Sequence, residues 1–154
     1  MLGHDLSPTV EWTCDVCGER ISRPEDGWVE WLGKTATTSQ SPPNLRLVHA
    51  WKSSPRNSAD RCQRPGASGL NDLPLPHFLG ADGLMRLLNL LDEGYLPKTE
   101  VIEMIQRLHI PGYEQARPHF ETAAAAGVVH PRMRPGFFFQ EQIQVVLDHY
   151  RQHE

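Results

Sequence analysis

Three cysteines within the first 62 residues have the type and spacing needed for metal chemistry. Cys14 and Cys17 are separated by two residues, Gly18 follows them directly, and Cys62 is the third cysteine. Two thiolates at this spacing can hold one tetrahedral ion, and a glycine lets the backbone curl beneath it. The N-terminal residues lack the pattern of a signal peptide, and three cysteines cannot all form disulfide pairs. We therefore expect a metal site, with ordinary buried cysteines or a redox dithiol as the alternative.

The C-x2-C-G turn of residues 14–18 resembles the zinc knuckle of the zinc-ribbon group. The resemblance covers residues 11–62, and it implies a β-hairpin after the knuckle and a second ligand pair later in the chain. Here that pair would be His49 and Cys62, which are farther apart than the usual tight pair. The resulting expectation is one structural Zn2+ ion held by Cys14, Cys17, His49 and Cys62.

The assignment of His49 depends on the strand that carries it. Leu45, Leu47 and His49 would share one face of that strand, so the imidazole would follow two core residues inward. With four protein ligands the site has no position for water or substrate, which makes it structural rather than catalytic. Three further side chains are candidates for the fourth ligand in place of His49: Asp15, Asp60 and His4.

The first 51 residues, which must position most of these ligands, have the sequence pattern of a small β module. All four tryptophans fall in the first 51 residues, among short β-prone runs. Residues 27–32 and 45–51 alternate well enough to form paired strands, and the segment 33–44 between them has no large apolar residue to anchor it. We expect a mobile loop there. Residues 52–76 are rich in Ser, Pro, Arg, Asn and Gly and predict an irregular connection.

Helical spacing of apolar residues begins near residue 82. Leucines at i, i+3, i+4 and i+7 predict a first helix that ends at Gly94. Pro118 lies inside a later helical run, so it must either kink that helix or mark the first turn of a shorter one. Three further helices are predicted from similar patterns, within residues 99–110, 113–126 and 143–150.

Between the last two helices, residues 128–130 and 137–139 are β-prone runs that suggest a hairpin. Three helices, a hairpin and a final helix make residues 82–154 resemble the winged-helix fold. In that family the third helix usually enters the DNA major groove and the hairpin touches the backbone or the minor groove. The resemblance implies outward-facing contact residues on the third helix and at the wing tip: Gln115, Arg117, His119, Arg132 and Arg134.

The whole chain is therefore expected to be an α+β protein with two modules. A zinc-ribbon-like β module with its irregular connector would span residues 1–66, a linker 67–81, and the winged-helix-like helical module 82–154. The longest apolar stretch is too short to span a bilayer, and we expect a cytoplasmic protein.

The charge balance bears on the class of partner. The net charge is −4, which argues against a chain that coats nucleic acid by bulk electrostatics. The acidic excess lies in the second half. One local basic cluster lies in the connector, where it is either a solvated loop or a phosphate-contacting edge: Lys52, Arg56, Arg61 and Arg64.

These observations favour a non-enzymatic binding or regulatory protein, whose partner is a protein or a nucleic acid. A sequence-reading DNA-binding transcriptional regulator is one alternative. An enzyme with its site at the module junction, using His77, His109 or His119, is another, although the sequence contains no nucleophile motif and no glycine-rich phosphate loop.

Overall fold

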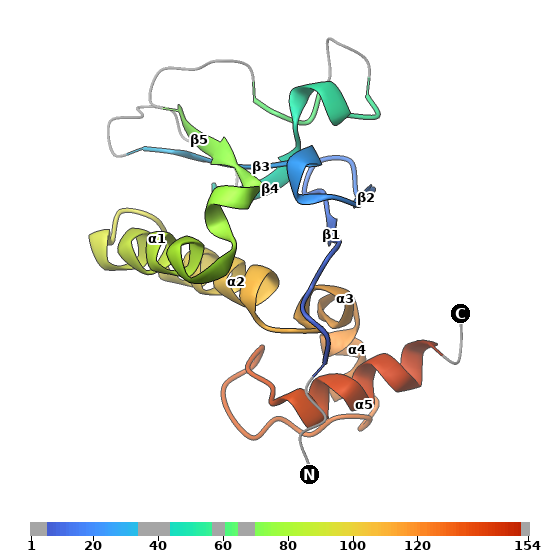
Figure 1. Cartoon of the computed structure of the whole chain (residues 1–154). Coiled ribbons are helices and arrows are strands. Elements are labelled where there is room, and N and C mark those ends of the chain that lie inside the picture. Colours follow the sequence, from blue (N-terminus) through green and yellow to red (C-terminus); the bar gives the residue numbers. More distant parts are fainter. Residues whose placement is uncertain (1–5, 34–43, 57–60, 65–69, 152–154) are drawn as a thin grey trace. The chain divides into compact units, whose positions relative to one another are not determined.

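A computed structural model describes residues 6–33, 44–56, 61–64 and 70–151 of the chain (Figure 1). The chain divides into two compact units. The sheet unit is Val10–His109, and the helical unit combines Met1–Thr9 with Ile110–Glu154. This division differs from the expected boundary at residues 67–81, because the first two helices belong with the strands.

In its described residues the sheet unit has five short strands, and all their pairings are antiparallel. Two of them, β1 (Trp12–Thr13) and β2 (Arg20–Ile21), pair across the cysteine turn. The other three form a sheet in the order β4-β3-β5. The central strand is β3 (Gly27–Leu32), and its pairing with β4 (Arg46–His49) confirms the pair of strands predicted from the sequence.

The third member of this sheet, β5 (Leu70–Pro74), was not predicted. Residues 52–76 were expected to be irregular throughout, and this part of the expectation is wrong. The strand runs along β3 at the sheet edge, with Val29 opposite Leu73, and its proline is the last residue, where a missing amide does least harm. A 310 helix, η4 (Leu75–Phe78), follows at once.

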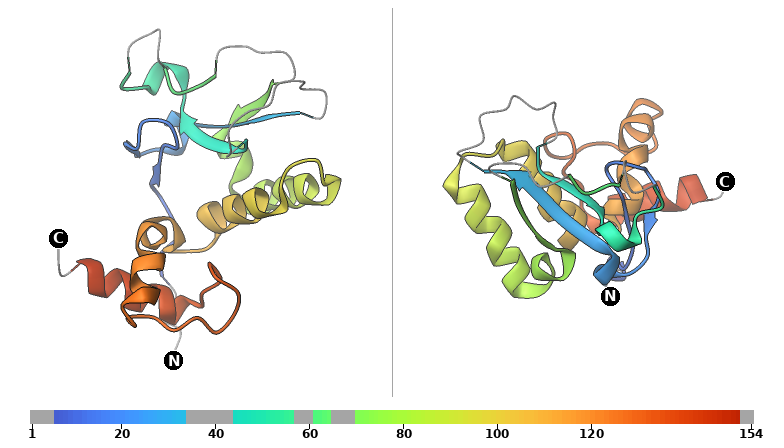
Figure 2. Two further views of the ribbon diagram at one scale, coloured as in Figure 1. Left: turned by 180° about the vertical axis from the view of Figure 1, so that it is seen from behind. Right: turned by 90° about the horizontal axis from the view of Figure 1, so that it is seen from above.

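Helices α1 (Gly80–Glu93) and α2 (Lys98–His109) lie side by side against one face of the three-stranded sheet (Figure 1, Figure 2). Both were predicted from their apolar spacing. Gly94 ends α1 in the left-handed conformation, with a φ of 78°. The apolar faces of the helices and of the sheet share one core, whose buried members include Val29, Leu47, Leu87, Val101 and Met104.

The helical unit contains three α-helices in its described residues. Its core draws on Tyr113, Phe120, Ile143 and Val146, all buried. The predicted helix over residues 113–126 is interrupted around Pro118, as the sequence required. Its elements are α3 (Tyr113–Ala116), the 310 helix η5 (Arg117–His119), α4 (Phe120–Ala125) and α5 (Gln140–Arg151).

The predicted hairpin over residues 128–130 and 137–139 is wrong, because neither run forms a strand. Pro131 and Pro135 have no amide hydrogen to donate to a ladder, and two three-residue strands have little stability of their own. The segment is instead an irregular loop tied to α5, since the Gln142 Nε2 donates to the carbonyl of His130 at 2.8 Å. The winged-helix resemblance therefore lacks its wing strands.

The loop predicted over residues 33–44 lies outside the described residues except for its ends, Gly33 and Asn44. Among the helices described, none combines the length and the apolar character that crossing a membrane requires.

Candidate metal centre

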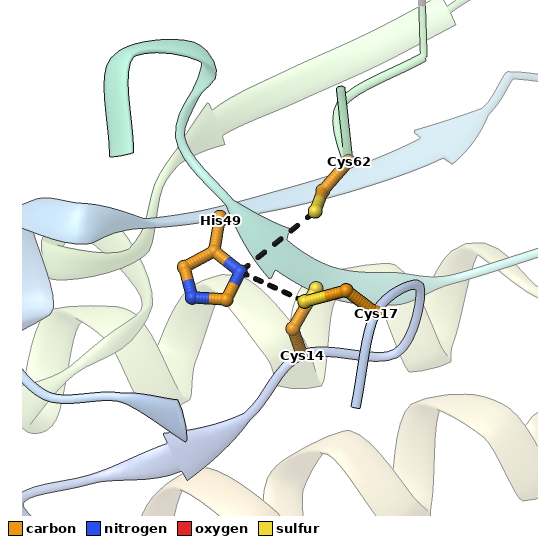
Figure 3. A group of neighbouring side chains, drawn as sticks. All are labelled: Cys14, Cys17, His49 and Cys62. Atoms are coloured by element: carbon orange, nitrogen blue, oxygen red, sulfur yellow. Dashed lines mark hydrogen bonds between the residues drawn. The ribbon is translucent and has the colours of Figure 1, made fainter. Parts of the chain in front are cut away.

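The side chains of Cys14, Cys17, His49 and Cys62 meet in the sheet unit (Figure 3). Their four potential ligand atoms all lie within 4.8 Å of one another. The Nδ1 of His49 is 3.4 Å from the Sγ of Cys17 and 3.8 Å from that of Cys62. None of the three cysteines forms a disulfide. The structure thus brings the four expected ligands together in a cluster that could hold one metal ion.

The cysteine turn is held by its own backbone. The Gly18 amide donates to the Cys14 carbonyl at 3.0 Å, and the Cys14 amide donates to the Glu19 carbonyl at 3.0 Å. Gly18 has a φ of 76°, in the left-handed region that a residue with a Cβ rarely adopts. The Val16 amide lies 3.4 Å from the Cys14 Sγ and points a donor at the sulfur. These contacts fix the backbone of the turn that carries both thiols.

His49 is the last residue of β4, and a hydrogen bond on the side of the ring away from the cysteines fixes its orientation. Its Nε2 lies 2.9 Å from the backbone carbonyl of Arg20. A carbonyl can only accept a hydrogen bond, so Nε2 carries the proton and Nδ1 presents its lone pair to the sulfurs. This is the arrangement that a metal-binding imidazole needs, because the bond behind the ring sets both tautomer and direction.

Cys62 reaches the cluster from the short described stretch 61–64. The hydroxyl of Ser54 lies 3.2 Å from its Sγ and accepts its amide hydrogen at 3.3 Å. The guanidinium of Arg46 donates to its carbonyl at 3.3 Å. Ser54 and Arg46 thus tie the third cysteine to the end of η2 (Trp51–Ser53) and to β4. Neither contact was foreseen from the sequence.

Asp15, a candidate for the fourth ligand, makes different contacts. Its Oδ2 accepts the Leu47 amide at 2.8 Å, and both its oxygens accept the Nη1 of Arg107, at 2.8 and 3.0 Å. Arg107 also donates to the Thr13 carbonyl at 2.9 Å, and its side chain is 3% exposed. The knuckle is therefore locked to α2 by a buried ion pair, for which the sequence carried no signal. Asp60 and His4, also candidates for the fourth ligand, lie outside the described residues.

Burial disfavours the thiolate form of Cys17 unless a cation is present. It raises the pKa of Cys17 to about 12, and the neighbouring Cys14 adds to the rise. A thiol in this position stays protonated at neutral pH without a metal, whereas a bound dication reverses the balance and deprotonates it. Protons and metal ions thus compete for the same sulfurs.

The basic cluster expected in the connector does not form a free cationic patch. The Arg61 guanidinium lies 5.3 Å from the ring centroid of Trp51 and donates to the carbonyl of that residue. The Arg64 amide donates to both carboxylate oxygens of Glu30 at 3.1 Å. Burial is the main cause that lowers the pKa of the Arg64 guanidinium. Lys52 and Arg56 are exposed.

Among the candidate contact residues of the helical unit, some have side-chain partners and others are exposed. Two have ionic partners: Arg117 lies 3.7 Å from Glu114, and Arg132 pairs with Glu141. The ring of His119 stacks on that of Tyr150 with centroids 4.4 Å apart. Gln115 and Arg134 are exposed.

Comparison of the chain with models of protein families, with curated proteins and with solved structures finds no match. A function for the chain must therefore be inferred from the geometry of these residues.

Proposed function

We propose that the protein is a non-enzymatic binding protein whose sheet unit is held together by one structural zinc ion. The observation that carries this is the closed set of four protein ligands, Cys14, Cys17, His49 and Cys62. Zn–S bonds of about 2.3 Å and Zn–N bonds of about 2.0 Å in a tetrahedron place sulfur and nitrogen about 3.5 Å apart. The observed separations from Nδ1 are 3.4 and 3.8 Å.

The donor set supports zinc among the common metals. Three thiolates and one imidazole are soft and borderline ligands, which exclude magnesium and calcium as the resident ion. Four protein ligands also fill a tetrahedral shell, so no position is left for a water molecule or a substrate. Such a site stabilises a fold, and the biological task falls to the surfaces it holds in place.

A titration with Co2+, a coloured stand-in for zinc, tests this site and its link to pH. We expect one equivalent to give the visible and near-ultraviolet absorption of a tetrahedral ion with thiolate ligands. Each thiol that loses its proton to the metal raises the affinity for Co2+ about tenfold per pH unit, as long as the pH is below the pKa of the thiol. The Kd for Co2+ should therefore fall steeply from pH 6 to pH 8. Affinity that does not change with pH, or the pale spectrum of a six-coordinate ion, would contradict the assignment.

Ion pairing supports a protein partner over a nucleic acid. Arg64 and Arg46 are committed to Glu30, and Arg117 and Arg132 to neighbouring glutamates. Phosphate binding depends on clustered cations that release counterions, and the whole chain carries a charge of −4. The unformed wing strands remove the second reason for proposing DNA contact. A transcriptional regulator that reads DNA is therefore the weaker hypothesis, and no contact among the described residues favours an enzyme.

The choice of partner class has a direct test. At ~0.15 M salt, fluorescence anisotropy should detect no binding of the protein to duplex or single-stranded oligonucleotides. A known DNA-binding domain measured in parallel shows that the assay works. Affinity that is measurable and falls steeply as salt rises would overturn the protein-partner proposal, and substitution of Lys52 and Arg56 would then locate the contact.

A further inference from the structure

The helical unit has an open groove with a volume of about 400 Å3 between the loop after α4 and the first turns of α5. Its apolar lining comes from Val128, Val129, Pro131 and Val145. This volume falls within the range of cavities that take up small ligands or a few side chains. The groove is separate from the metal cluster, which belongs to the sheet unit.

A buried glutamine holds both walls of the groove in place. The side chain of Gln142 is on α5, and its Nε2 donates to the carbonyl of His130 in the loop at 2.8 Å. Its Oε1 accepts the amide of Phe139 at 2.8 Å. Gln142 is only 4% exposed, so these bonds are shielded from water. The groove is therefore preformed, and a ligand need not spend binding energy on ordering it.

The segment that lines the groove exposes several large apolar side chains. Val145, which lines it, is 47% exposed. Three more large apolar side chains nearby in the sequence are also exposed: Met133 at 45%, Phe137 at 37% and Phe139 at 50%. Single exposed apolar residues are ordinary, but several in one short segment that also lines an apolar groove are typical of an interaction surface.

The same segment is locally basic in an acidic chain. From Thr122 to Gln140 the sequence contains no Asp or Glu, whereas it contains Arg132 and Arg134. Glu141 neutralises Arg132 at the edge of the groove. Arg134 is exposed and makes no ion pair within the described part of the chain. The lining of the groove is therefore nearly neutral, and the one arginine of its loop without an ion pair, Arg134, lies two residues beyond the lining residue Arg132.

From this combination we propose that the groove binds a short peptide segment of a protein partner that carries large apolar side chains flanked by carboxylates. The apolar side chains enter between Val129 and Val145, and the carboxylates lie near Arg134. This inference rests on the proposed binding function and names the chemistry of its partner. A nucleic acid fits less well, because bases and phosphates would need more than one unpaired arginine.

Selection of short random peptides, displayed on phage, against the full-length zinc-loaded protein tests the proposal. We expect enrichment of sequences with one or two large apolar residues and neighbouring Asp or Glu. A synthetic peptide of the enriched sequence, labelled with fluorescein, then gives a Kd by anisotropy. A version with Lys in place of each acid should bind at least about tenfold more weakly.

One substitution in the groove, one in the loop that lines it, and two controls locate the site. Val145→Glu should weaken the enriched peptide by about tenfold or more, and Arg134→Glu by about threefold to tenfold. The controls, Met85→Glu on α1 and Arg56→Glu after η2, change residues of the sheet unit that are also exposed. They should leave the Kd within about twofold. Circular dichroism and zinc content check that each variant is folded.

Each outcome decides the question. No enriched peptide, a basic consensus, or an affinity that Val145→Glu leaves unchanged would overturn the groove proposal. Competition by an oligonucleotide that weakens as salt rises would assign the groove to nucleic acid instead. Zinc content and tryptophan emission measured on the same preparation keep the two proposals apart. Zinc-loaded protein that binds no peptide overturns only the groove, and zinc-free protein whose tryptophans keep their native emission overturns only the structural zinc site.

Discussion

Replacing Cys62 with serine should leave the sheet unit unfolded and free of zinc. A structural zinc site of this kind contributes about 10 kcal/mol or more of apparent free energy, which is comparable to the whole stability of a small domain. Cys62 is the ligand farthest along the chain from the cysteine turn, so its loss also removes the metal link between the stretch 61–64 and β4. Cys14→Ser should have the same effect from the other side.

Metal analysis of the purified protein and fluorescence of the four tryptophans measure this result. The wild-type chain should contain one equivalent of zinc, and the serine variants close to none. All the tryptophans lie in the sheet unit, so their emission should shift to that of solvated indole. Val10→Ser, which changes a residue that is 67% exposed in the same unit, is the control and should retain zinc and fold. A folded Cys62→Ser protein without metal would refute the structural zinc site.

Arg107→Met should be the most damaging change outside the ligands, at about 3–5 kcal/mol of unfolding free energy. The substitution leaves the carboxylate of Asp15 in a shielded position without its cation, and it removes the donor to the Thr13 carbonyl. The cost comes from the uncompensated charge more than from the lost attraction. Urea unfolding followed by tryptophan fluorescence, with zinc saturating throughout, gives the number.

The same substitution at an exposed ion pair is the matched control. Arg20 lies 3.0 Å from Glu11, but their side chains are 70% and 41% exposed. Arg20→Met should therefore cost less than about 1 kcal/mol, because solvent screens the pair in the native protein. Equal losses for the two variants would show that the ion pair of Arg107 does not lock the knuckle to α2.

The metal cluster could be predicted from the sequence because its signals are local. The Cys14–Cys17 spacing fixes two ligands, and strand alternation places His49 on the inward face. The ion pair between Asp15 and Arg107 joins residues 92 positions apart, and the sequence around neither residue predicts it. Long-range pairs of this kind depend on how the elements pack, which a single sequence does not specify.

For the fold too, elements with a local sequence pattern could be predicted, and those that depend on distant pairing could not. The apolar periodicity of α1 and α2 predicted both helices, but not that they belong to one unit with the strands. The strand β5 was missed because Leu70–Pro74 contains asparagine, aspartate and proline, and gains its structure from pairing with β3. The hairpin predicted at residues 128–139 is wrong because Pro131 and Pro135 have no amide hydrogen for a strand ladder, and the short β-prone runs beside them do not compensate.

The helical unit is built from two stretches of chain that the sheet unit separates. The Leu6 amide donates to the Gln140 Oε1 at 3.0 Å, so residues on either side of Val10–His109 join in one unit. Closing a flexible loop of this length would cost roughly 4 kcal/mol in chain entropy. The bond from Arg107 to Thr13 draws the ends of the insert together once it has folded. During synthesis Val10–His109 leaves the ribosome before α5. A metal ion bound by the nascent sheet unit would therefore bring the two parts of the helical unit together, although the helical unit contains none of the ligands.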